Sequence, residues 1–182
     1  VTINCLANNF GEDELSTLLA AIKGTSVRSL CGLTEGQTVA DFSGQNLGPI
    51  DCRIMAAEFS FQGFITSLTS LCCGSNPIKD EGMAVLLDAV KGIGLIEFDI
   101  SKTEIGPPTA KKLAEVLSDA TPFTASINSL TVDSTGDTQD WRGDWNNGGP
   151  KTYTLTAGEE KVDLSQKNLG SADVALVAVW LQ

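Results

Sequence analysis

Two stretches of this sequence decide its fold: residues 33–59 read LTEGQTVADFSGQNLGPIDCRIMAAEF, and residues 155–181 read LTAGEEKVDLSQKNLGSADVALVAVWL. They align without a gap over 27 positions, of which 10 are identical. An internal repeat of this kind indicates a chain built from stacked copies of one supersecondary unit. The repeated unit, rather than any single motif, therefore predicts the fold.

Further copies of the unit occur as INCLANNF from Ile3, LCCGSNPI from Leu71 and FDISKTEI from Phe98. Each copy places apolar residues in alternation before a polar residue at a turn, and that residue is called the turn marker below. The spacings between successive markers are 37, 31, 27, 32 and 32 residues. The six turn markers are Asn8, Gln45, Asn76, Thr103, Thr135 and Lys167.

The period of the apolar residues changes at each marker. The alternation before the marker is typical of a strand with one buried face. Apolar pairs four residues apart follow five of the six markers, and this spacing defines one face of a helix. Each unit is therefore predicted as strand, turn and helix, with parallel strands joined by right-handed crossovers. The pairs are Leu18 and Ile22, Met55 and Phe59, Leu86 and Val90, Leu113 and Leu117, and Val177 and Leu181.

The segments LTSLCCGSN, residues 68–76, and LIEFDISKT, residues 95–103, resemble the pattern L-x-x-L-x-L-x-x-N of ribonuclease-inhibitor-like leucine-rich repeats. Cys73 replaces the third leucine, and several markers replace the asparagine. The resemblance covers residues 1–182. It implies an α/β fold, a right-handed leucine-rich-repeat solenoid or horseshoe with a parallel concave sheet, convex helices and about five or six repeats. We expect one such domain, belonging to a longer repeat protein.

Three segments depart from the repeat. Residues 136–150 contain no helical spacing of aliphatic residues and are predicted to form an irregular loop. Residues 28–43 and 151–165 are each predicted to form an extra hairpin before a regular strand. Their turns are expected at Glu35-Gly36 and Ala157-Gly158.

Charge and cysteine content narrow the choice of partners. With 12 Lys and Arg against 23 Asp and Glu, the net charge is −11, which disfavours nucleic acid and favours a basic protein partner. No apolar run is long enough to predict a membrane span. The five cysteines show no C-x-x-C spacing, so we expect free thiols and an intracellular location, cytoplasmic or organellar.

Residues that alternate with the buried strand positions are predicted to point into the concave face. Carboxylates outnumber cations among them, which suggests an acidic groove for a basic protein or peptide. The alternative is that these residues only keep the face soluble. The candidate binding residues are Asp41, Ser43, Glu97, Asp99, Ser101, Asp133, Asp163 and Ser165, and Asn4, Cys72, Gly74 and Thr131 complete the face.

A second candidate surface is the segment DWRGDW within the irregular loop. Trp141, Arg142 and Trp145 belong to residue types enriched at binding hot spots. The alternative is that both tryptophans cover the repeat that lacks a helix. Arg142-Gly143-Asp144 is also the tripeptide of integrin ligands, although a chance match is the simpler explanation.

An enzyme is not predicted. The chain has no histidine, so Ser-His-Asp and Cys-His arrangements are excluded within it, and no phosphate-binding loop, cofactor site or metal site is expected. The leading hypothesis is a protein-interaction module or scaffold. The alternatives are a regulator or inhibitor of an enzyme or small GTPase, and a constitutive subunit of a large assembly.

Overall fold

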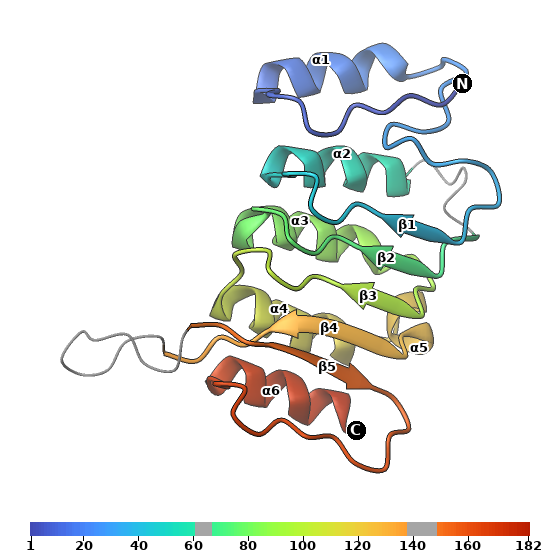
Figure 1. Ribbon diagram of the computed structural model, residues 1–182. Coiled ribbons are helices and arrows are strands. Elements are labelled where there is room, and N and C mark those ends of the chain that lie inside the picture. Colours follow the sequence, from blue (N-terminus) through green and yellow to red (C-terminus); the bar gives the residue numbers. More distant parts are fainter. Residues whose placement is uncertain (61–66, 138–148) are drawn as a thin grey trace.

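The structure is a computed structural model that describes residues 1–60, 67–137 and 149–182 (Figure 1). These residues form a mixed α/β fold with six helices and one five-stranded sheet in the order β1-β2-β3-β4-β5. The strands are β1 Val39–Asp41, β2 Ser70–Cys72, β3 Glu97–Asp99, β4 Ser129–Asp133 and β5 Thr152–Thr156. The helices are α1 Glu12–Ile22, α2 Pro49–Ser60, α3 Lys79–Val90, α4 Pro107–Ser118, α5 Pro122–Ser126 and α6 Ser171–Trp180.

The sheet separates a buried face from an open face. β1 to β4 pair in parallel, and β5 pairs antiparallel with β4. One residue of each strand lies in an aligned, buried row that faces the helices, which form a layer behind the sheet (Figure 1). That row consists of Ala40, Leu71, Phe98, Leu130 and Leu155.

The turn at the marker has the same backbone geometry in five units. The residue before the marker adopts a left-handed conformation, with φ between 54° and 64°. Only one of the five is glycine, so four side chains accept a conformation that L-residues rarely adopt. The repeated sequence therefore specifies a repeated backbone turn. The five residues are Ala7, Gly44, Ser75, Lys102 and Gln166.

Three helices begin with the same capping arrangement. Glycine occupies the N-cap, where it has no side chain to offer, and the acidic residue three positions later accepts a hydrogen bond from the glycine N–H. The donor–acceptor distances are 3.0 Å for Gly11 and Glu14, 2.8 Å for Gly48 and Asp51, and 2.7 Å for Gly170 and Asp173.

Buried side chains join the turns of neighbouring units. Asn76, 1% exposed, accepts a hydrogen bond from the Leu47 N–H at 3.0 Å. Its amide group donates to the Phe42 and Cys73 carbonyl oxygens at 2.9 and 2.8 Å. Asn76 thereby satisfies backbone groups of two successive turns that water does not reach.

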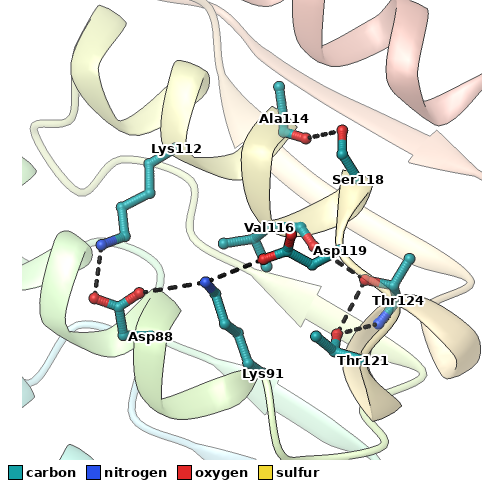
Figure 2. Close-up of polar contacts among 9 residues, drawn as sticks. All are labelled: Asp88, Lys91, Lys112, Ala114, Val116, Ser118, Asp119, Thr121 and Thr124. Atoms are coloured by element: carbon teal, nitrogen blue, oxygen red, sulfur yellow. Dashed lines mark hydrogen bonds and ion pairs between the residues drawn. The ribbon is translucent and has the colours of Figure 1, made fainter.

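A charge network on the helix side joins α3 to α4 (Figure 2). Asp88 contacts Lys112 at 2.7 Å and Lys91 at 3.7 Å, and Lys91 also contacts Asp119 at 3.3 Å. Beside it, the Thr124 hydroxyl donates to the Val116 carbonyl at 3.1 Å and ties α5 back to α4. Lys91 and Lys112 are therefore already paired with carboxylates.

The prediction of an α/β fold with alternating strands and helices is confirmed for the described residues, whereas both hairpin predictions are wrong. β5 pairs with β4, not with residues 161–165, which form no strand. Near the amino end, Ser29 and Cys31 form bridges with Thr2 and Asn4 instead of with β1. The predicted loop 136–150 falls largely outside the described residues.

The antiparallel β5 has a physical reason. The Ser134 N–H donates to the Lys151 carbonyl at 3.0 Å, so the chain returns beside the strand it has just left. A strand that returns directly beside its predecessor runs antiparallel, whereas a parallel neighbour needs a crossover. Tyr153 and Leu155 are buried and alternate with threonines, and this alternation predicts a strand over residues 152–156. It does not predict which strand pairs with it.

The helix register is tested by Leu86→Ala. Leu86 is fully buried, so its truncation opens a cavity behind the sheet and should lower the free energy of unfolding by about 2 to 5 kcal/mol. Val174→Ala, at a site 59% exposed, serves as the control and should cost less than about 0.5 kcal/mol. Urea denaturation measures both; equal losses would contradict the register.

The bridging role of Asn76 is tested by Asn76→Ala. The substitution leaves the Leu47 N–H and buried carbonyl oxygens without partners and should cost about 2 kcal/mol or more. Asn8 is the matched marker of the first unit; it is exposed and donates to the Cys5 carbonyl at 2.9 Å. Asn8→Ala should therefore cost less than about 1 kcal/mol. A smaller loss for Asn76→Ala than for Asn8→Ala would refute the bridging role.

Candidate functional site

The face of the sheet turned away from the helices carries two aligned rows of side chains, called the open face below. None of its ten residues is buried, in contrast to the row between them. Three are carboxylates, five are serines or threonines, and none is lysine or arginine. The rows are Val39, Ser70, Glu97, Ser129 and Thr156, and Asp41, Cys72, Asp99, Thr131 and Thr154.

A shallow hollow of about 330 Å³ lies over β2, β3 and β4. Its side chains combine two carboxylates on the central strand with small groups on the flanking strands. The small groups leave space beside the carboxylates. The open-face residues that line it are Ser70, Cys72, Glu97, Asp99, Ser129 and Thr131.

Serines that follow the strands hold the aspartates of the open face. Asp41 accepts hydrogen bonds from the Ser43 N–H at 2.9 Å and the Ser43 hydroxyl at 2.6 Å, and these bonds lower the pKa of Asp41 below its usual value. The Ser101 N–H donates to Asp99 at 2.9 Å. The serine that follows each strand therefore orients both aspartates.

Asp99 has a second neighbour on the open face. The Cys72 thiol lies 3.7 Å from its other carboxylate oxygen. Glu97, by contrast, is exposed, and no hydrogen bond or ion pair restrains its side chain among the described residues. The hollow thus combines one positioned carboxylate with one that is free to adjust.

The carboxylates of the open face have no cationic partner in the described part of the chain. The five ion pairs found there all involve helix residues or the residues that directly follow a helix. Arg53, Lys91 and Lys112 supply all the cations of these pairs. The negative charge of the open face is therefore unneutralised while that of the helix layer is partly neutralised.

Two of the predicted site positions are corrected. Asp133 lies on β4 but is 8% exposed, and its carboxylate accepts from the Lys102 N–H and the Thr152 hydroxyl, each at 2.6 Å. Asp163 and Ser165 are exposed but lie outside every strand, because β5 occupies the place beside β4. None of the three belongs to the open face.

The remaining predicted residues divide into two groups. Asp41, Glu97 and Asp99 lie on the open face, with Ser43 and Ser101 directly after the strands. Trp141, Arg142 and Trp145 lie outside the described residues. The sequence prediction also omitted Ser70, Ser129, Thr154 and Thr156, although each lies two positions from another residue of the open face, which is the spacing that defines one face of a strand.

All five cysteines are free. Cys31, Cys52 and Cys73 are buried in the core, and burial raises the pKa of each thiol, that of Cys52 to about 12. Burial also raises the pKa of Cys72, which is only partly covered. Raised pKa values suppress the thiolate, so these cysteines are poor nucleophiles at neutral pH.

A second hollow of about 330 Å³ lies where the ends of α4 and α6 approach β5. Leu117, Ile127, Val179 and Trp180 give it apolar walls, and Ser118 and Thr124 contribute hydroxyls that donate to the carbonyl oxygens of Ala114 and Val116. It contains no charged side chain. Volume therefore does not distinguish the two hollows, but unneutralised charge does.

No cluster of three or more metal-ligating side chains occurs in residues 1–60, 67–137 and 149–182. Within the same ranges, no helix has the length and apolarity needed to cross a membrane. Comparison of the sequence with protein-family models finds no match, and comparison with curated proteins finds no similar sequence.

The buried thiols predict a loss of stability at alkaline pH. The folded state holds the Cys52 proton up to about pH 12, whereas the unfolded chain releases it near the ordinary value of 9.0. Stability from this group is therefore complete below pH 9 and falls as pH rises, by up to about 1.4 kcal/mol per pH unit.

Cys52→Ala should make the decline of the unfolding free energy between pH 9 and 11 shallower. Urea denaturation at several pH values measures this slope, which is independent of the packing that alanine removes at every pH. Cys5→Ala is the control, because Cys5 is only partly buried and not part of the core. An unchanged slope for Cys52→Ala, or an equal change for Cys5→Ala, would contradict the assignment.

Proposed function

We propose that the chain is a protein-interaction module or scaffold that binds a basic protein partner through the open face of its sheet. The observation that carries this proposal is the unneutralised set of Asp41, Glu97 and Asp99 on an uncovered face. Parallel sheets usually have both faces covered, so an uncovered face is available for a partner.

We further propose that the units form a right-handed leucine-rich-repeat solenoid whose concave surface is the open face. Three observations support this finer description: parallel strands that alternate with helices, the left-handed residue repeated before five markers, and Asn76 bridging two turns. In such a solenoid each unit contacts its sequence neighbours, which leaves one extended surface for binding.

Rigidity supports binding by this face. Asp41 and Asp99 are held by their following serines, and the strands beneath them are hydrogen-bonded along the row. A partner that meets oriented carboxylates loses less conformational entropy than one that must order them. Attraction between opposite charges also speeds the encounter of the two proteins. Salt screens this attraction, so binding should weaken at high salt.

The proposal is tested by affinity capture from the native source, with wild-type protein and charge-reversed variants at low and high salt. Glu97→Lys is the main variant, because Glu97 is exposed and its removal breaks no observed contact. Proteins recovered by wild type at low salt should be reduced at least about tenfold by Glu97→Lys and by high salt. Quantitative mass spectrometry measures the reduction.

Asp163→Lys is the matched control. Asp163 accepts a hydrogen bond from the N–H of the serine two positions later, at 2.9 Å, as Asp99 does, but it lies off the sheet. It changes the net charge by the same amount as Glu97→Lys, and capture should be retained. Equal loss with both variants would reduce the effect to net charge, and retention by Glu97→Lys would exclude the open face as the binding surface.

A further inference from the structure

The hollow over β2, β3 and β4 has a shape that restricts which basic group it can accept. Glu97 and Asp99 are two residues apart on one strand, so their Cα atoms are about 6.5 to 7 Å apart on the same face. Ser70 and Ser129 flank Glu97, and Cys72 and Thr131 flank Asp99. The space between the carboxylates is thus bordered by small side chains.

Gly74, two residues after β2, lies close to Asp99 at one end of this hollow. A Cβ atom at Gly74 would lie 3.3 Å from the Ser101 carbonyl and 3.5 Å from the Asp99 carboxylate. A side chain there would press against Ser101 and come into van der Waals contact with the Asp99 carboxylate. Glycine at this point therefore leaves Asp99 without a further side-chain neighbour on that side.

The polar groups around the hollow are acceptors or can serve as acceptors. Asp99 keeps free lone pairs beyond its bond with Ser101, Glu97 is unrestrained, and the Ser70 and Ser129 hydroxyls can rotate to accept. A group that fills the hollow must therefore be a donor that reaches two carboxylates at once. A planar guanidinium offers parallel N–H groups on more than one edge, whereas an ammonium is a single point charge.

We propose that this hollow holds one arginine side chain of the basic partner, with its guanidinium between Glu97 and Asp99. This inference rests on the proposed function and adds the residue type that anchors the partner. Asp99 supplies a fixed acceptor, and Glu97 closes over the bound group. Arginine is also among the residue types that anchor interfaces most often.

The test uses a blocked Gly-Gly-Arg-Gly-Gly peptide as the probe, with lysine and citrulline versions of the same length. Amide chemical shifts of the labelled protein are followed by NMR during titration. The arginine peptide should bind at least about fivefold more tightly than the lysine peptide, because only the fork reaches both carboxylates. The largest shifts should fall on Ser70, Glu97, Asp99 and Ser129.

Conservative variants assign the contacts. Asp99→Asn can still accept from the Ser101 N–H and so keeps the turn, but it removes the charge. Asp99→Asn and Glu97→Gln should each weaken arginine binding by about threefold or more, since each removes a charge-assisted hydrogen bond. Asp163→Asn, with the same turn off the sheet, should leave binding unchanged.

Equal affinity for arginine and lysine, or for arginine and citrulline, would overturn the inference. So would an effect of Asp163→Asn as large as that of Asp99→Asn. These outcomes are separable from the failure of the proposed function. If the peptides do not discriminate but Glu97→Lys still abolishes capture, the open face binds its partner without an arginine anchor; if capture is also unaffected, the open face is not the binding surface.

Discussion

The structure depends on how neighbouring units satisfy the backbone groups of their turns. Every successive pair of units is joined by a side-chain oxygen of one that accepts a backbone N–H of the other. The bond from Leu47 to Asn76 is buried and the other four are partly buried, and an unsatisfied buried donor costs about 1 to 3 kcal/mol. The five joining contacts are Ala7 to Asp51, Leu47 to Asn76, Gly106 to Asp80, Lys102 to Asp133 and Thr135 to Asp173.

This constraint explains part of the acidity of the chain. Four of the five joining acceptors are aspartates, and Glu58, 4% exposed, serves similarly by accepting from the N–H groups of Leu30 and Cys31. Asp173 also accepts from the buried Tyr153 hydroxyl at 3.0 Å and so ties β5 to α6. The net charge of −11 is therefore no measure of a binding surface by itself. Only carboxylates that do not join the turns of neighbouring units, such as Glu97 and Asp99, are available to a partner.

The sequence predicted the repeated units well and their exceptions poorly, for the same physical reason. Periodicity reports burial, so Leu71, Phe98 and Leu86 could be placed in the core from their spacing alone. Periodicity does not report partners. Asp133 and Ser101 each lie two residues before a marker, yet Asp133 is buried and accepts hydrogen bonds from Thr152 and Lys102, because β5 lies beside β4 in a way that no local pattern specifies. Asp163 lies off the sheet for the same reason, since β5 occupies the place beside β4 that residues 161–165 were expected to fill.

The open face remains uncovered because the helices lie on the other side of the sheet. Each crossover from one parallel strand to the next carries its helix to the same side of the sheet, so the helices gather in one layer (Figure 1). An uncovered parallel sheet would expose apolar residues unless its outer rows were polar, and nine of the ten residues of the open face are polar or are cysteine. Solubility alone is met by any polar residue, including lysine. The absence of lysine and arginine from both described rows leaves this face with negative charge only, and that is the observation behind the proposal of a basic partner.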